Sequence, residues 1–298
     1  MASRVQMVKS KNLISPPKWL PPNIHYEVMA GSQSYNVQTA DSDMDVVGFC
    51  IPPKDNIFPH LKGEILGFGN QTQRFDVWQE HHIIDKETDK EYDFSIYSIV
   101  KFFQLAMENN PNIIDVLHVP QHCVLFASSI GQMVRDNRSK FLHKGSYQKL
   151  RGYAYSQLHK IGTKVNSANP KRLASIEKHK YCTKFGYHIV RLVLQSEQIL
   201  IEHELDIGKN AKILKAVRSG EWSEEKLRSW FDEKEKHLES LYVTSTLRHG
   251  PDEEFIKKLL FECLESHYGS LSDAVKMEVP VDRMISELKS VIEKYEGR

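Results

Sequence analysis

The fold is decided by the stretch Ala30-Gly31-Ser32-Gln33-Ser34-Tyr35 and by the run that follows it, Asp43-Met44-Asp45-Val46-Val47-Gly48. Residues 26–30, just ahead of the first stretch, are apolar and β-branched enough to predict a strand. Gly31 allows a sharp turn because it has no Cβ, and Ser32 can begin a helix. Backbone N–H groups and a hydroxyl at such a helix start bind phosphate, so this turn is a candidate phosphate site.

The second run is predicted to be a strand over residues 43–51. Asp43 and Asp45 are two residues apart, so both carboxylates point to the same face of that strand. Two adjacent carboxylates repel each other, and a divalent cation relieves the repulsion. Oxygen ligands beside a phosphate cradle suit Mg²⁺, which binds through one or two carboxylates together with substrate phosphates. The alternative is an Asp-rich surface turn between two ordinary strands.

A glycine-serine turn, a spacer of about ten residues and an Asp-x-Asp strand resemble the signature of the polymerase-β-like nucleotidyltransferase superfamily. The longer pattern resembles the predicted nucleotidyltransferases of the YcgL/RlaP type, which are associated with RNA repair pathways and are also carried by large phages. A second match lies downstream, where Asp93-Phe94-Ser95-Ile96-Tyr97-Ser98 precedes a predicted helix over 99–109 and then Asn110-Pro111-Asn112. The resemblance covers most of the chain.

Asp93 is the candidate for a third carboxylate. Residues 75–78 and 91–97 are predicted to be strands, and the charged turn between them, residues 85–90, predicts a hairpin. A two-metal transfer site needs a third carboxylate beside the first two, and in the resembled superfamily it comes from a neighbouring strand. Asp93 fits that place, whereas the alternatives are a solvated hairpin residue or competition from Asp76 or Glu80.

The chain has 298 residues, a formal charge of +1 and ordinary globular proportions of hydrophobic (40%) and charged (27%) residues. This length predicts two compact units. Residues 135–184 hold thirteen Lys/Arg and two acidic residues, whereas residues 197–298 hold sixteen basic and twenty-two acidic ones. Such a basic middle indicates a polyanionic partner. Four scattered cysteines, no signal peptide and no membrane-length apolar run predict a cytoplasmic protein without disulfides, zinc or membrane contact.

The second half is predicted to be helical from about residue 124 onward. The helix over 99–109 has apolar residues on one face and should pack on the sheet, and Pro111 should end it. His118 is predicted to be structural, and a domain boundary is expected at about residue 122. Farther along, Ser223 with the two acids after it predicts a helix N-cap, and residues 249–252 predict a break between helices.

Two segments of the helical region are candidate binding surfaces. Residues 141–161 interleave basic residues with tyrosines, a texture that can bind nucleic acid through phosphate contacts and base stacking; the alternative is a helix with an apolar core face and a merely solvated basic face. The candidate acceptor-binding residues are Lys144, Lys149, Arg151 and Tyr155. A long helix over about 172–205 would carry Lys180, Lys184, His188, Arg191 and Gln195 in one stripe.

The resemblance implies an α+β protein. A nucleotidyltransferase palm over residues 1–122, with a mixed sheet and flanking helices, would be followed by an all-helical domain over 123–298. The implied activity is metal-dependent transfer of an NMP from an NTP to an acceptor hydroxyl. RNA, such as a damaged tRNA end in repair or modification, is the favoured acceptor. A protein acceptor, as in AMPylation, and a catalytically silent RNA- or partner-binding palm are the alternatives.

The implied site residues follow the same resemblance. Two Mg²⁺ or Mn²⁺ ions would be held by the catalytic carboxylates Asp43, Asp45 and Asp93. The NTP would be contacted by Gly31, Ser32, Ser34, Lys184, His188 and Arg191. The preferred nucleotide and the oligomeric state are not predicted by the sequence.

Overall fold

The computed structural model describes residues 2–38, 43–57, 74–163 and 169–269, together with residues 285, 288, 289 and 292. The chain divides into two compact units, one of Met1–Pro52 with Asp76–His267 and the other of Pro53–Phe75 with Tyr268–Arg298. The described part of the second unit includes the short helix α2 (Lys54–Ile57). The candidate site residues all belong to the first unit.

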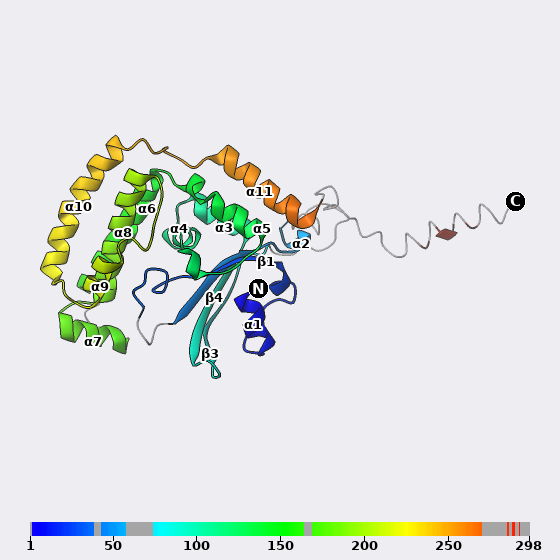
Figure 1. Cartoon of the computed structure of the whole chain (residues 1–298), viewed down its shortest axis with the longest axis horizontal. Helices are drawn as coiled ribbons and strands as arrows, with labels where there is room; N and C mark the ends of the chain where they lie inside the picture. Colours follow the sequence, from blue (N-terminus) through cyan, green and yellow to red (C-terminus); the bar gives the residue numbers. More distant parts are fainter. Residues whose placement is uncertain are drawn as a thin grey trace. The chain divides into compact units, whose positions relative to one another are not determined.

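A mixed sheet lies at the centre of the first unit, and its described strands have the order β3-β4-β2-β1-β5 (Figure 1). Strands β2 and β4 are parallel, and the other pairs are antiparallel. The predicted first strand, the Asp-x-Asp strand and the hairpin are confirmed. The strands are β1 (Ile24–Met29), β2 (Met44–Cys50), β3 (Val77–Asp85), β4 (Lys90–Ser98) and β5 (Val124–Ala127).

Strand β5 corrects the prediction that the chain is helical from about residue 124. It pairs antiparallel with β1, with Tyr26 opposite Ala127 and Val28 opposite Val124. A short apolar run such as Val-Leu-Phe-Ala has no periodicity that separates a strand from a helix, so its pairing partner decides. The sheet therefore continues past residue 122. The division into a palm over 1–122 and a helical domain over 123–298 stays a prediction.

The two faces of the sheet are covered differently. The Tyr26 hydroxyl donates to the Val116 carbonyl of α4 at 3.1 Å and accepts from Arg135 of α5 at 2.9 Å. Its neighbour Glu27 points to the opposite face, where its carboxylate accepts the Arg4 backbone N–H of α1 at 2.5 Å. Because side chains alternate along a strand, α1 covers one face while α4 and α5 cover the other.

Helices flank the sheet and form the rest of the unit, so the fold is α+β, as predicted. The helix expected over 99–109 is confirmed as α3, which begins after the N-cap Ser98, and α4 begins directly at Pro111. The remaining helices are α1 (Arg4–Ser10), α3 (Ile99–Met107), α4 (Pro111–Leu117), α5 (Ser129–Asp136), α6 (Gly145–Thr163), α7 (Pro170–His179), α8 (Thr183–Glu202), α9 (Ala211–Arg218), α10 (Glu224–Thr244) and α11 (Glu253–Tyr268).

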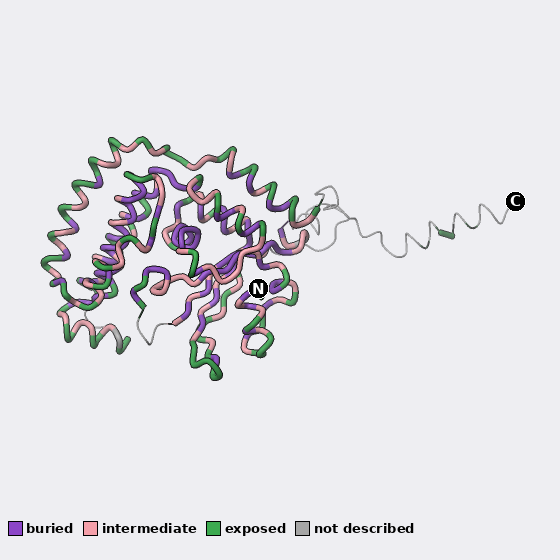
Figure 2. The backbone as a smooth tube through the Cα atoms, viewed as in Figure 1, coloured by how far each residue is buried: buried purple, intermediate pink, exposed green. Residues whose placement is uncertain are grey.

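Helix α8 is the centre of the helical region. It is buried over most of its length and packs against α6, α9 and α10 (Figure 2). The predicted single helix over 172–205 is wrong, since α7 ends at His179 and Lys180 adopts a left-handed conformation with φ of 69°. Lys180 therefore leaves the predicted stripe, and the stripe begins at Lys184. The Ser223 N-cap and the break before α11 are confirmed. No described helix has the length and apolar character needed to cross a membrane.

Candidate nucleotidyl-transfer site

Two carboxylates face each other across the parallel pair β2 and β4. The register places Asp45 directly opposite Asp93. Both residues share the face of Phe49 and Tyr97, four residues farther along the same strands. Phe49 packs against Phe102 of α3, with ring centroids 5.0 Å apart. Helix α3 thus covers the far end of this face, and the carboxylates lie at the opposite end of the strands.

The electrostatics of Asp45 indicate a like-charged cluster. Burial raises the pKa of the Asp45 carboxyl, and the charges of Asp93 and Asp43 raise this pKa further. Lys184 and His81 act in the opposite direction. The structure therefore brings the three predicted carboxylates into electrostatic range of one another, with one cation from α8 beside them.

The turn after β1 packs directly on Asp45. Gly31 has a φ of 64°, and a Cβ at this position would overlap the Asp45 carboxylate. The Ala30 N–H donates to the Asp45 carbonyl at 2.8 Å, so strand pairing continues to the edge of the turn. Glycine is required here both for the positive φ and for the close approach.

The turn is closed on itself and is not the start of a helix, which corrects the prediction for Ser32. Residues 31–36 form turns, and the Val37 N–H donates a hydrogen bond to the Ser32 carbonyl at 3.0 Å. The buried Ser34 hydroxyl donates to the Gly31 carbonyl at 2.9 Å. Ser34 thus stabilises the turn from inside, whereas Ser32 is half-buried at its surface.

A metal fits this set of residues. Carboxylate oxygens are the ligands Mg²⁺ prefers, and Mg²⁺ needs only one or two of them when substrate phosphates supply the rest. Burial raises the pKa of Asp45, and the charges of Asp93 and Asp43 add a repulsion that a divalent cation would relieve. Within the described ranges, no three His, Cys, Asp or Glu side chains are already close enough together to form a complete metal cage.

Cations gather around His188 on α8. Burial lowers the pKa of the His188 imidazole well below its usual value, and the cations Arg191, Lys184, Arg218 and Lys160 lower this pKa further. These residues come from α6, α8 and α9. The Arg218 guanidinium lies over the Tyr187 ring, 5.7 Å from its centroid, and the Tyr187 and His188 rings are 5.0 Å apart. Such a concentration of positive charge is typical of an anion-binding site.

Arg191, predicted to contact the nucleotide, lies in the core. Its Nη1 is 3.1 Å from Asp115 Oδ2 of α4, and both side chains are less than a tenth exposed. The Tyr35 hydroxyl accepts from Arg191 at 3.2 Å and from Gln195 at 2.9 Å. Burial raises the pKa of Asp115, whereas Arg191, Tyr35 and Gln195 lower it. The network anchors the turn after β1, through Tyr35, to α4 and α8.

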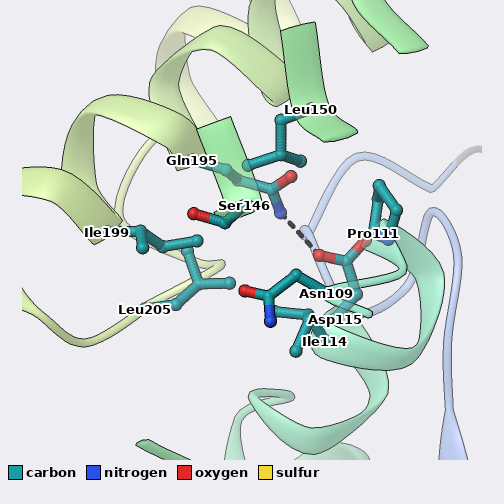
Figure 3. A pocket seen from close by; sticks show the side chains of 9 residues that line it. All are labelled: Asn109, Pro111, Ile114, Asp115, Ser146, Leu150, Gln195, Ile199 and Leu205. Carbon is teal, nitrogen blue, oxygen red and sulfur yellow. Dashed lines mark hydrogen bonds between the residues drawn. The ribbon is translucent and has the colours of Figure 1, made fainter. Parts of the chain in front are cut away.

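A small pocket lies beside this network, with Asp115 and Gln195 in its lining. Figure 3 shows the Gln195 amide directed at Asp115, with a 2.6 Å hydrogen bond between them. In the part of the chain that the structure describes, three buried polar atoms at its wall have no hydrogen-bond partner: Asn109 Oδ1, Ser146 Oγ and Gln195 Oε1. Gln195, which belongs to the predicted stripe on α8, lines this pocket, whereas none of the candidate carboxylates does, so the pocket is separate from them.

Comparison with known proteins identifies the family of this chain. The model of the RNA repair pathway DNA polymerase beta family, RlaP, matches residues 3–262. The chain belongs to this family. The polymerase-β-like nucleotidyltransferase resemblance seen in the sequence is thereby confirmed, and the RlaP match spans the carboxylates, the turn after β1 and helices α6 to α10.

Two similar proteins accompany the RlaP match. A protein of Enterobacteria phage T4, described as an uncharacterized 38.9 kDa protein in the nrdC-mobD intergenic region, is 28% identical over 137 residues. The match covers 45% of this chain and 37% of the phage protein, so the chain spans little more than a third of that relative's length. A nucleotidyltransferase-like protein from Exiguobacterium sibiricum is 12% identical, with 97% of this chain and 90% of that chain covered at a TM-score of 0.29. A similarity at that TM-score supports no conclusion about this chain.

The candidate acceptor-binding residues of this RlaP member are engaged within the helical region. Lys144 is buried, with its ammonium 5.6 Å from the centroid of the Tyr242 ring. The Lys149 side chain is 53% exposed and lies 3.8 Å from Glu108. Arg151 Nη2 is 2.7 Å from Glu235 of α10, and the Tyr155 hydroxyl donates to the same carboxylate. Their assignment to RNA binding stays a prediction.

Sequence reasoning missed four residues near the carboxylates and His188. His81 and His82 lie on β3 opposite Asp93, and Lys160 and Arg218 belong to the cations around His188. Lys160 lies in the basic segment 141–161 that the sequence analysis singled out, whereas Arg218 lies outside it and was marked by no sequence signal. No sequence signal marked His81 and His82, because their position depends on the strand register.

Proposed function

We propose that this RlaP member is a metal-dependent nucleotidyltransferase that moves an NMP from an NTP to the hydroxyl of an RNA acceptor. The observation that carries the proposal is the pairing of Asp45 with Asp93 across β2 and β4, with Asp43 nearby and the Gly31 turn against Asp45. Adjacent carboxylates that could hold metal ions beside a substrate phosphate are what two-metal phosphoryl chemistry requires.

The proposed reaction needs only the NTP and the acceptor hydroxyl as reactants. The acceptor oxygen forms a bond to the α-phosphorus, the bond from that phosphorus to the bridging oxygen breaks, and pyrophosphate leaves with the electron pair. The hydroxyl proton passes to a carboxylate or to solvent. Two Mg²⁺ or Mn²⁺ ions, when bound, would neutralise charge that develops on the phosphates.

The chain's own residues have distinct parts in this proposal. Asp43, Asp45 and Asp93 would hold the metal ions, and Asp93 would help to take up the acceptor proton. The turn at Gly31 and Ser32, which packs against Asp45, would contact the β- and γ-phosphates through its backbone and the half-buried Ser32 hydroxyl. Lys184, which is exposed and within electrostatic range of Asp45, offers a charge-assisted contact to the triphosphate. Lys160 and Arg218 extend that positive region around the His188 imidazole, whose pKa burial and these cations lower.

The acceptor is proposed to be RNA for two reasons. The family description names an RNA repair pathway, and residues 135–184 are strongly basic. RNA affinity should then fall steeply with salt concentration, because binding releases counterions. The four cysteines are free and buried, which supports the cytoplasmic location that we propose with this function.

One labelling experiment tests the proposal. The protein is incubated with each α-³²P NTP, Mg²⁺ or Mn²⁺ and total RNA, and the Asp45→Asn variant is the matched control. We expect label on RNA with the wild type and none with the variant. Label on polypeptide would overturn the RNA acceptor in favour of protein nucleotidylation. No label, together with no Mg²⁺–NTP binding in a titration, would overturn catalysis in favour of a silent binding module.

A further inference from the structure

Strand β3 contains an irregularity directly opposite Asp93. The pairing of β3 with β4 is regular from Val77 to Glu80, which lies opposite Phe94, and resumes at Ile83 opposite Tyr92. Two residues, His81 and His82, therefore face the single residue Asp93. This is the two-against-one arrangement of a β-bulge, and bulges often lie beside active sites, where they redirect a side chain or an amide.

The bulge holds the Asp93 carboxylate by its backbone. The His82 N–H donates to Asp93 Oδ1 at 2.7 Å, a distance typical of a strong charge-assisted hydrogen bond. The His81 Nδ1 lies 3.6 Å from the same oxygen. The His82 ring points elsewhere, with Nδ1 at 2.6 Å from Glu91 Oε1. His82 thus contributes its amide, and not its imidazole, to Asp93.

The backbone of His82 is in an unusual conformation that this contact requires. Its φ is 59°, in the left-handed region that non-glycine residues adopt rarely and β-branched residues almost never. Uncommon backbone conformations of this kind persist where surrounding structure fixes them, and they cluster at functional sites. Here the conformation turns an N–H of an outer strand toward a carboxylate that lies beside Asp45.

We propose that the His81–His82 bulge is a positioning device that orients Asp93 for metal binding. The inference rests on the proposed role of Asp93 as a metal ligand. Its chemical basis is that carboxylates that bind metals are themselves oriented by hydrogen bonds from neighbouring groups, and that loss of such a bond weakens metal affinity or activity by roughly 10- to 100-fold. His81 and His82 are positioning residues, because they act through Asp93.

A matched pair of substitutions separates the backbone from the imidazole. His82→Gly and His82→Val both remove the ring, but glycine adopts a positive φ freely whereas valine resists it. Mn²⁺ affinity is measured without nucleotide, by electron paramagnetic resonance of free Mn²⁺, and circular dichroism confirms folding. We expect His82→Gly to bind Mn²⁺ within about twofold of the wild type and His82→Val to bind it about tenfold more weakly. Equal affinity of the valine variant and the wild type, or equal weakening in both variants, would overturn the proposal.

A second measurement applies if His82→Val does not fold. Amide hydrogen exchange at His82 is compared between the wild type and Asp93→Ala. Faster exchange in Asp93→Ala supports the hydrogen bond to the carboxylate, and equal rates overturn it. The readouts also separate the two proposals. A wild type that transfers no nucleotide but shows the expected Mn²⁺ series contradicts only the proposed function, whereas active enzyme with identical glycine and valine variants contradicts only the bulge.

Discussion

Two charged regions of this protein are built on opposite principles. Asp45 and Asp93 lie opposite each other in the parallel pair β2 and β4, and the charge of Asp93 raises the pKa of the Asp45 carboxyl beyond the effect of burial. Along α6 and α10, Arg151 and Glu235 of opposite charge are paired at 2.7 Å. The charges of α6 and α10 neutralise each other within the folded chain. The carboxylates of β2 and β4 would need a bound cation to neutralise them. Unpaired like charge therefore marks the candidate active site better than charge density does.

Removing one of the like charges should give the largest effect. Asp45→Asn keeps the size of the side chain but removes one carboxylate, so metal binding and transfer should be lost by about 10³-fold or more. The same change relieves repulsion with Asp93, so the melting temperature should stay level or rise. Transfer assays and thermal unfolding of the same sample test this. An Asp45→Asn protein with wild-type turnover would show that the pair is not catalytic.

The buried ion pair of Arg191 and Asp115 contrasts with the carboxylate pair, because here a buried carboxylate already has a cation beside it. Arg191→Met leaves Asp115 charged and buried, and such a change costs about 3–5 kcal/mol of unfolding free energy. Chemical denaturation measures this loss, with Arg191→Lys as the milder control that keeps the charge. A stable Arg191→Met protein that has lost only NTP affinity would instead support the nucleotide contact predicted from the sequence.

The carboxylates were predicted from the sequence, whereas the ion pairs between α6 and α10 were not, for a physical reason. Asp45 was predictable because alternation along a strand is a local rule, whereas Asp93 was assigned through the family resemblance, since the pairing of β2 with β4 is not local. The ion pair of Arg151 with Glu235 joins residues 84 apart in sequence, and nothing local specifies it. The bulge at His81 and His82 depends on how two strands align, which composition does not encode.

Among the described residues, Glu27 is a buried carboxyl without a neighbouring acid, and it can be compared with Asp45. Burial raises the pKa of Glu27 to about 7 from its ordinary 4.5, although the Arg4 and Val5 amides lower it. Because the folded pKa lies above the unfolded one, the stabilisation is complete below about pH 4.5 and is lost as pH rises through about 7. The loss amounts to at most roughly 3 kcal/mol.

Denaturation between pH 5 and 8 tests the role of Glu27. The free energy of unfolding should fall with rising pH in the wild type and fall less in Glu27→Gln, which does not titrate and keeps one of the two oxygens that accept the Arg4 and Val5 amides. Identical pH slopes in the two proteins would exclude Glu27 as the source. Asp45 differs from Glu27 in that neighbouring acids, and not burial alone, raise its pKa.

The smallest expected effects compare two cations that differ in pairing. Lys184 is exposed and, among the described residues, has no carboxylate within ion-pair distance, whereas Arg151 contacts Glu235 and Glu239. Lys184→Gln should weaken binding of Mg²⁺–NTP by about tenfold, because a charge-assisted bond to phosphate is lost. Arg151→Gln should leave NTP binding within about twofold and lower stability by less than about 1 kcal/mol, since the pair is partly exposed.

Titration calorimetry with Mg²⁺–NTP, together with denaturation of the same two variants, measures both quantities. If the two substitutions weaken NTP binding equally, cation pairing does not distinguish functional from structural charge in this protein. If instead Arg151→Gln alone lowers RNA affinity, α6 exchanges its acidic partners on α10 for phosphates when RNA binds. Arg151 would then pair with Glu235 and Glu239 only in the free protein and with RNA phosphates in the complex. The two charged regions would differ only in whether their partner is already present before ligand binds.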